Sequence, residues 1–236
     1  MEEKFKGLVV SAINYGENDK ILTVFTLEHG TLTVKIKGVK KAGAKLKFAS
    51  EPFCFAEFVV VKKADKMTVK SASLIDSFYP IRENIERFFA GGTILEFIRK
   101  FNKENMESGD LFMLTLKSLE SLAYGDENPK SVCVKFLISA LKFSGFGLNF
   151  IGCAECETMP KGRVFFDYST GAFYCENCKE DGFREINFLT FLALQKADSG
   201  EVLLGEESDF SLRLINFYLI NKAEERLKSL DELIKL

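Results

Sequence analysis

Tryptophan is absent from the sequence, histidine occurs only once, and no apolar run approaches the roughly 20 residues that span a bilayer. The first residues, MEEKFKG, are charged and lack the apolar stretch of a signal peptide. We therefore expect a soluble cytoplasmic protein that does not enter a membrane. Apolar residues make up 47% of the 236 positions, enough for a packed core in one large domain or two to three small ones.

The signatures of common catalytic sites are missing as well. His29 falls in a predicted hairpin turn, where a histidine is more often an ordinary polar residue than a general base. Neither Gly-x-Ser-x-Gly nor the His-x-Glu and Pro-Cys-x-x-Cys pattern of zinc deaminases occurs. The segment 38–43 has the two glycines of a phosphate-binding P-loop, but Ala44 and Lys45 replace its lysine and hydroxyl residue. We expect no enzymatic activity and no nucleotide hydrolysis.

The first third of the chain has the pattern of short β-strands. These segments are rich in Val, Ile, Thr and Phe, and turn residues separate them. The second and third meet at Glu28-His29-Gly30, a tight hairpin in which glycine can take a positive φ. Five short strands with a long loop between the third and fourth predict a small closed barrel of the OB type. The strands are expected at residues 5–13, 21–27, 31–38, 53–62 and 67–75.

After Pro80 the apolar residues follow a helical period instead. Asp110 is the expected cap of a helix over 111–124, and Asn128-Pro129 supplies an N-cap and first-turn proline for a helix over 130–143. Further helices are expected at 187–197 and 211–235. The fold class is therefore α+β, with four predicted parts: an OB domain (1–80), a helical domain (81–150), a cysteine-containing insert (151–185) and C-terminal helices packing on the helical domain (186–236).

Positive charge is concentrated near the amino terminus. Residues 1–70 carry a net charge of +5, whereas the remaining residues carry −7. Within 35–48 there are six lysines and no acid, which is typical of a solvated loop or of a surface that binds a polyanion. A barrel with such a strip suits single-stranded nucleic acid, whose bases stack on aromatic rings. The candidate rings are Phe25, Phe53, Phe55 and Tyr79, and for each of them a place in the core is the alternative in a chain this rich in phenylalanine. The predicted DNA-binding residues are Lys35, Lys37, Lys40, Lys41, Lys45 and Lys47.

Two Cys-x2-Cys pairs carry the strongest chemical signal. Cys153 and Cys156 are separated by eighteen residues from Cys175 and Cys178, and the segment between the pairs has the pattern of a hairpin that turns at residues 169–171. Disulfides and a redox-active pair are the alternatives, but a cytoplasmic protein seldom keeps disulfides and no thioredoxin-like pattern surrounds either pair. We predict one Zn²⁺ per chain on four thiolates, which leave no open position and make the zinc structural.

Several short motifs occur in a fixed order along nearly the whole chain. They are Tyr15-Gly16-Glu17-Asn18-Asp19 with Gly30, Lys37-Gly38-Val39-Lys40-Lys41, Pro52-Phe53, Ser77-Phe78-Tyr79-Pro80-Ile81-Arg82 and the four cysteines. In this order they resemble the RecO family of bacterial DNA repair proteins, which are recombination mediators. The sequence departs from that family in carrying lysine at positions that are often arginine, and Lys179 where a glycine is common after the second cysteine pair.

The resemblance implies binding of single- and double-stranded DNA, annealing of complementary strands without ATP, and assistance to RecA on DNA coated with single-strand-binding protein. The implied partners are RecR, the C-terminal tail of single-strand-binding protein and, indirectly, RecA, with association with the nucleoid during repair. For the tail we predict an apolar groove at Phe136, Leu141 and Phe143 beside Lys135 and Lys142, with buried core as the alternative.

Two other classes of function remain open at this stage. The protein can be a zinc-containing scaffold for other proteins, with a barrel that is only structural, and salt-dependent DNA binding by residues 1–80 would distinguish the two. It can also be a zinc hydrolase or nuclease, although a metal held by four cysteines argues against that class.

Overall fold

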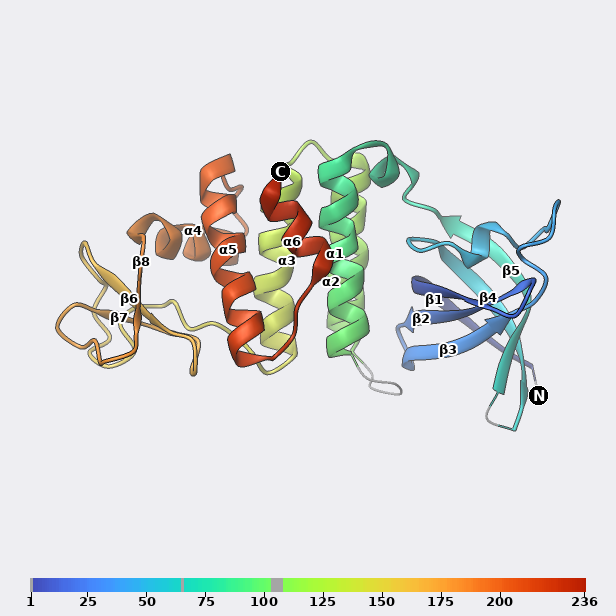
Figure 1. Ribbon diagram of the computed structural model, residues 1–236, viewed down its shortest axis with the longest axis horizontal. Coiled ribbons are helices and arrows are strands. Elements are labelled where there is room, and N and C mark those ends of the chain that lie inside the picture. Colours follow the sequence, from blue (N-terminus) through green and yellow to red (C-terminus); the bar gives the residue numbers. More distant parts are fainter. Residues whose placement is uncertain (1, 65, 103–107) are drawn as a thin grey trace. The chain divides into compact units, whose positions relative to one another are not determined.

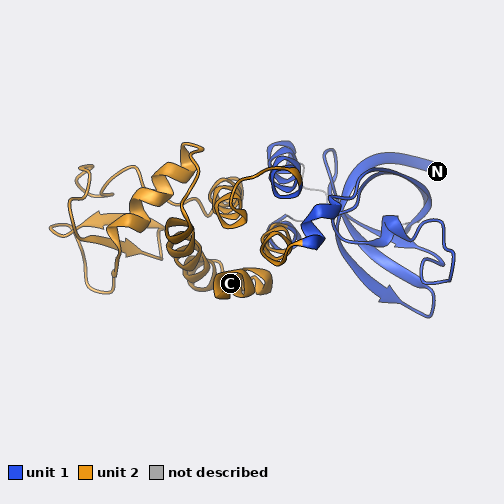
Figure 2. Cartoon of the chain, turned by 90° about the horizontal axis from the view of Figure 1, so that it is seen from above, with its two compact units in different colours: residues 1–83, 95–123 blue, residues 84–94, 124–236 orange. Residues whose placement is uncertain are grey.

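The computed structural model describes residues 2–64, 66–102 and 108–236. The chain divides into two compact units, residues 1–83 with 95–123, and residues 84–94 with 124–236 (Figure 2). The first unit holds a closed β-barrel, and the second is built of helices and a small sheet. The predicted α+β class is therefore confirmed. The finer four-part division drawn from the sequence stays a prediction.

The barrel consists of β1 (Glu2–Tyr15), β2 (Asp19–Thr26), β3 (Gly30–Ile36), β4 (Phe55–Lys63) and β5 (Lys66–Asp76). Its strand order is β1-β2-β3-β5-β4, in which only β3 and β5 run parallel (Figure 1). All five strands were predicted, and the hairpin between β2 and β3 turns where expected, with Gly30 at φ 61°. This closed five-stranded arrangement fits the OB type.

Buried and exposed side chains alternate along the strands, and the buried ones fill the barrel. In β3, Leu32, Val34 and Ile36 are buried while Thr33 is exposed, as the period of two requires. Gly7 lies where β1 pairs with both β2 and β4, and a Cβ at this position would stand 2.4 Å from Val24 Cγ1. Only a residue without a side chain fits at that crossing.

The helices of the second half begin with α1 (Ile85–Phe101), which follows a 3₁₀ turn at Tyr79–Glu83, and α2 (Gly109–Tyr124). α2 belongs, up to Ala123, to the same unit as the barrel, where the Phe112 ring meets those of Phe25 at 5.3 Å and Phe55 at 6.1 Å. The predicted cap at Asp110 is wrong: the helix already begins at Gly109, so Asp110 lies in its first turn, where a carboxylate still complements the helix dipole.

The second unit contains α3 (Pro129–Phe143), α4 (Phe188–Asp198), α5 (Gly205–Lys222) and α6 (Lys228–Lys235). The start of α3 is confirmed, since the Asn128 side chain accepts a hydrogen bond from the Lys130 N–H at 2.8 Å. The single helix expected over 211–235 is wrong. The chain leaves α5 at Ala223, Glu224 takes a positive φ of 54°, and α6 returns against α5 through a 3.0 Å bond from Asn216 Nδ2 to Asp231 Oδ1.

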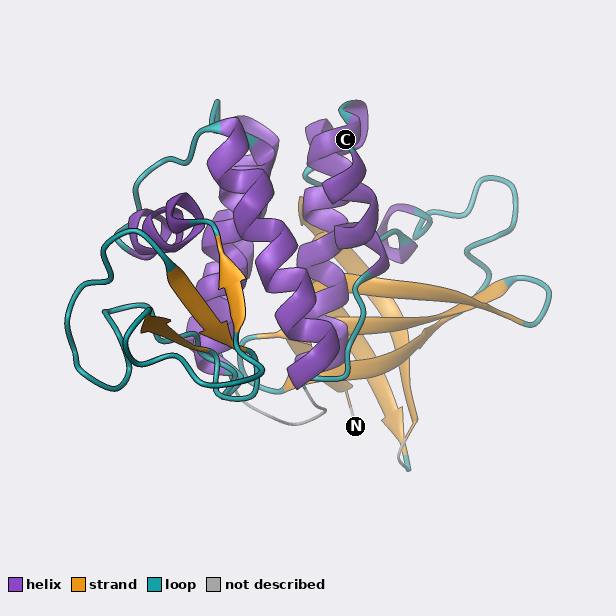
Figure 3. Cartoon of the chain, turned by 60° about the vertical axis from the view of Figure 1, so that its left-hand side comes forward, coloured by secondary structure: helices purple, strands orange, loops and turns teal. Residues whose placement is uncertain are grey.

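The insert carries β6 (Val164–Asp167), β7 (Ala172–Cys175) and β8 (Arg184–Ile186), which form a three-stranded sheet in the order β7-β6-β8. Figure 3 draws these strands, like all others, in orange, and they form a sheet of their own. β6 and β7 form the predicted hairpin, whose turn is held by the Asp167 carboxylate: it accepts hydrogen bonds from the Ser169 N–H at 2.8 Å and the Thr170 hydroxyl at 2.6 Å. In the part of the chain that is described, no helix is long and apolar enough to cross a membrane.

Candidate metal centre and nucleic-acid interface

Four cysteine sulfurs converge at one end of the insert. The Sγ atoms of Cys153, Cys156, Cys175 and Cys178 all lie within 4.8 Å of one another, and none of these cysteines is disulfide-bonded. A tetrahedral zinc site with Zn–S bonds of about 2.3 Å places its sulfurs about 3.8 Å apart. The Cys156 and Cys175 sulfurs are 3.8 Å apart, so the spacing fits a tetrahedral thiolate centre.

The backbone around these cysteines forms two tight turns. Cys153 donates its N–H to the Thr158 carbonyl at 2.9 Å and accepts the Glu157 N–H at 2.9 Å, which closes the first turn, with Glu157 in the left-handed region. In the second turn the Cys178 N–H bonds the Cys175 carbonyl at 3.2 Å. Both turns present their two sulfurs to the same point.

The electrostatics of the cluster favour a cation. A hydrogen bond from the Thr158 hydroxyl, 3.0 Å away, lowers the pKa of the Cys156 thiol to about 6. The neighbouring Cys175 sulfur, by contrast, raises the pKa of Cys178 to about 12. Sulfurs this close cannot all ionise beside one another without a positive charge between them, and a divalent ion would remove that conflict.

An arginine braces the same insert. Arg163, just before β6, bonds Glu185 of β8 through its Nε at 2.9 Å and Glu176 of the second cysteine turn through its Nη1 at 2.7 Å. These carboxylates raise the pKa of Arg163 further above its already high value, and the pKa of Glu185 is lowered in return. The brace ties the second cysteine turn to the edge of the sheet.

The other two cysteines belong to the core. Cys54 is 1% exposed in the barrel unit and Cys133 is fully buried in α3. Burial raises the pKa of the Cys54 thiol to about 11 and that of Cys133 to about 12, because the thiolate would lose its hydration. Neither can act as a thiolate ligand or nucleophile near neutral pH.

The loop that follows β3 is the predicted basic segment, and the structure leaves most of its charge in solvent. Five lysines there are exposed and form no ion pair with any residue that the structure describes: Lys37, Lys40, Lys41, Lys45 and Lys47. Gly38 and Gly43 turn this loop with φ values of 70° and 73°. We refer to residues 37–47 as the basic loop.

Lys35 differs from the other five. It is 31% exposed on β3, its Nζ lies 2.8 Å from Asp19 Oδ2, and it also stands 4.5 Å from the centre of the Tyr15 ring. Unlike Lys37, Lys35 is therefore engaged by an acidic residue on the adjacent strand, and its predicted role in DNA binding stays a prediction. Lys37 lies one residue beyond the end of β3 and forms no ion pair with the Asp19 carboxylate.

Asp19 anchors the basic loop, a role that was not predicted from the sequence. Its Oδ1 accepts the Gly38 N–H at 2.9 Å, and next to it the Asn18 carbonyl accepts the Lys40 N–H at 3.1 Å. The hydrogen bond from Lys35, followed by that from Gly38, holds the pKa of Asp19 below its usual value. The turn between β1 and β2 thus fixes where the basic loop starts. The sequence signal for this role is the motif Tyr15-Gly16-Glu17-Asn18-Asp19, in which Asp19 is the last residue.

The candidate stacking rings differ strongly in how exposed they are to solvent. Phe25 is fully buried and Phe53 is 3% exposed, so neither face of these rings is open to a base. Phe55 is half-buried against α2, whereas Tyr79 is 60% exposed. Of the four rings considered from the sequence, Tyr79 alone presents a large free surface.

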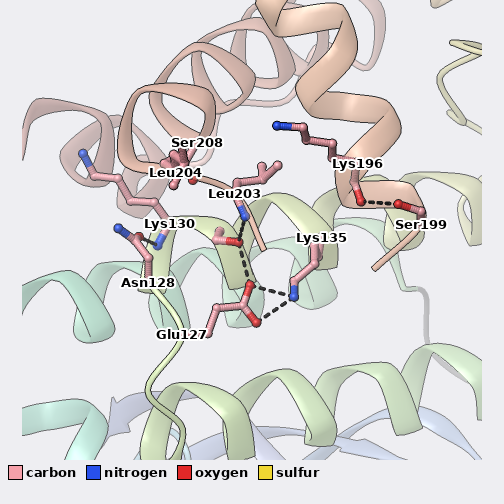
Figure 4. A network of polar contacts seen from close by, with 10 residues as sticks. Glu127, Asn128, Lys130, Lys135, Lys196, Ser199, Leu203, Leu204 and Ser208 are labelled. Carbon is pink, nitrogen blue, oxygen red and sulfur yellow. Dashed lines mark hydrogen bonds and ion pairs between the residues drawn. The ribbon is translucent and has the colours of Figure 1, made fainter. Parts of the chain in front are cut away.

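The groove predicted on α3 is not formed. Phe136 and Leu141 are buried in the second unit, although Phe143 is half-exposed. Lys135 bonds Glu127 at 2.6 Å, and the same carboxylate accepts the Ser131 hydroxyl, which in turn accepts the buried Leu203 N–H (Figure 4). Lys142 pairs with Asp198. This surface of α3 is therefore core edged by ion-paired lysines.

Comparison with known proteins covers both units. Residues 1–78 match the family model for the recombination protein O N-terminal region, and residues 82–231 match that for its C-terminal region. The chain is 33% identical to the DNA repair protein RecO of Caldicellulosiruptor saccharolyticus over 78% of its own length and 75% of the relative's. It is 28% identical to RecO of Exiguobacterium sp. over 100% and 98% of the two chains, and 27% identical to that of Myxococcus xanthus over 95% and 93%.

The two family models together account for nearly the whole chain, from the barrel through the cysteine insert to the last helix. The sequence motifs that suggested the resemblance lie at structurally defined points, among them the turn that anchors the basic loop and the four converging cysteines. The chain belongs to the RecO family of DNA repair and recombination proteins.

Proposed function

We propose that this protein binds single- and double-stranded DNA through the basic loop, anneals complementary strands without a nucleotide, and assists RecA on DNA coated with single-strand-binding protein. The observation that carries the proposal is the set of five exposed lysines of the basic loop, none paired with an acid in the described parts of the chain, beside a closed barrel. Such a loop tracks phosphates and does not read sequence.

The decisive experiment measures DNA binding and strand annealing by the full-length protein against salt, with and without ATP and Mg²⁺. We expect log affinity to fall linearly with log salt and annealing to be the same in both conditions, because residues 38–45 lack the Lys-Ser/Thr ending of a P-loop. DNA affinity that does not change with salt would show that the basic loop does not bind DNA phosphates. Annealing that requires ATP would remove the nucleotide-independent mechanism.

We further propose that one structural Zn²⁺ is held by the four cysteines of the insert. The support is the 3.8 Å sulfur spacing and the need for a cation among mutually close thiols. The ion would fix the two turns and leave no open position for substrate. It would therefore contribute folding energy and no chemistry.

For partners, we propose RecR and single-strand-binding protein, with the acidic tail of the latter docking on the second unit. A cleft of about 440 Å³ between β8, α4 and α5 combines Phe210, Phe217 and Ile220 with the guanidinium groups of Arg184 and Arg213. No ion pair of either arginine is found among the described residues, and Arg184 stacks at 4.3 Å on Phe217. An apolar cleft edged by arginines suits a peptide that ends in apolar side chains and a carboxylate.

A labelled tail peptide tests this site. Arg213→Glu should weaken its binding to the full-length protein strongly, whereas Lys135→Glu on α3 should not. If the reverse holds, the tail binds α3 and the cleft has another use. Loss of the arginine should leave DNA binding by the basic loop intact.

A further inference from the structure

An exposed aromatic ring stands beside the basic loop. Tyr15, the last residue of β1, is 51% exposed, and Ile13, two residues earlier on the same face of the strand, is 59% exposed. Because the two side chains are neighbours on one face, they leave an apolar surface on the outside of the barrel that is open to a ligand. Tyr15 was not among the rings considered from the sequence.

The strand register places this pair next to the lysines. Tyr15 lies opposite Asp19 on β2, Ile13 lies opposite Ile21, and Ile21 lies opposite Lys35 on β3. All five side chains therefore share the outward face of three adjacent strands. The basic loop begins two residues after Lys35, so phosphate-binding charge and an exposed apolar surface are continuous.

Tyr15 is held in place before any ligand arrives. The Lys35 ammonium sits 4.5 Å from the ring centre, and Asp19 fixes that ammonium at 2.8 Å while also bonding the Gly38 N–H. A cation near the face of a tyrosine is attracted by the ring's quadrupole, which restricts the ring's motion. Asp19 thus positions both the aromatic ring and the start of the basic loop through one carboxylate.

We propose that Tyr15, with Ile13 beside it, is the platform on which a base of single-stranded DNA stacks while the neighbouring phosphates lie along the basic loop. This rests on the DNA binding proposed above and adds its aromatic half. Stacking tolerates any base, since every base has a π-face, and the turn between β1 and β2 is one of the loops that OB barrels use for oligonucleotides. Lys35 acts here as a positioning residue, not as a phosphate ligand.

The absence of tryptophan makes a direct test possible. In the full-length protein, Tyr15→Trp introduces a single tryptophan at the platform, and its fluorescence should be strongly quenched by a thymidine oligonucleotide. Tyr124→Trp is the matched control, because Tyr124 is 56% exposed but lies in the second unit. Its fluorescence should change little in the same titration. Equal quenching at both positions, or none at position 15, overturns the proposal.

Affinity supplies the second measurement. Tyr15→Leu removes the ring but keeps an apolar side chain, and binding of the single strand should weaken on the order of tenfold. The salt slope should not change, because no charge is altered. Tyr15→Phe should bind like the parent, since it keeps the ring. Thermal unfolding of each variant verifies that the barrel is intact.

The outcomes separate this inference from the proposed function. If the parent binds DNA and lysine variants lose its salt dependence, but Tyr15→Leu binds as well as the parent, the platform is overturned and DNA binding stands. If the parent does not bind DNA, both fail. If Tyr15→Leu keeps DNA affinity but loses binding to RecR or single-strand-binding protein, the exposed pair is a protein contact and the stacking role is overturned.

Discussion

Reversing the charge of Lys40, Lys41 and Lys45 to glutamate is the sharpest test of the basic loop. Each phosphate that a lysine neutralises on a single strand contributes about 0.7 to the slope of log affinity against log salt. Three lost contacts should therefore lower the magnitude of the slope by about 2. If all five free lysines touch phosphates, the parent's slope would be about 3.5.

Stability should hardly respond to the same change. All three lysines are exposed, and none has an ion pair among the residues that the structure describes. Surface substitutions of this kind usually alter the free energy of unfolding by no more than about 0.5 kcal/mol. The weakening should also be the same for unrelated DNA sequences, because phosphate contacts carry no base information.

The assay is fluorescence anisotropy of a labelled single strand at several salt concentrations, with thermal unfolding in parallel. A matched control replaces Lys6, Lys63 and Lys66 by glutamate, which makes the same charge change on exposed sites of the same unit outside the loop. The control should keep most of the parent's slope. Equal losses in both variants would mean that only net charge matters. An unchanged slope in the loop variant would show that these lysines are solvated charge.

Three further predictions concern the parts that hold the fold and the loop. The parent should contain one zinc by elemental analysis, and Cys156→Ser should lose it and unfold the insert, because structural zinc supplies on the order of 10 kcal/mol; metal-free parent protein with paired cysteines would refute this. Gly7→Ala should lower the free energy of unfolding by about 1–3 kcal/mol through the clash with Val24, measured by denaturant titration, and an equally stable variant would show that β1 can shift. Asp19→Asn keeps an acceptor for the loop but releases Lys35, so the salt slope should steepen by up to about 0.7, and an unchanged slope would place Lys35 away from the DNA even when freed.

Much of the barrel could be predicted because its signals are local. Alternation in β3 and the Asn-Pro start of α3 each depend on a few neighbouring residues, and both are confirmed. The spacing of the cysteine pairs likewise predicted that four sulfurs converge. In these cases the residues that decide the structure lie next to one another in the sequence.

The errors arose where distant residues decide. The apolar pattern continues through 211–235, and only the packing of α6 back on α5 requires the break at Glu224. Lys35 looked like its neighbour Lys37 until the pairing of β2 with β3 placed Asp19 beside it. Phe25 was a candidate ring with core packing as the alternative, and its contact with Phe112 of α2, which the sequence of β2 does not show, decides for the core.

Outside the metal cluster, each unit contains one buried cysteine that can report when that unit opens. Cys54 lies in the unit of the barrel and Cys133 in the unit of the helices, and with thiol pKa values near 11 and 12 both are inert while their surroundings stay closed. A thiol-specific reagent therefore reacts with either one only when that unit opens. Mass spectrometry of the modified peptides would measure the rate at which each unit opens, and no mutation of the protein is needed. DNA bound to the basic loop should then slow the modification of Cys54, because a ligand that binds the folded unit stabilises it.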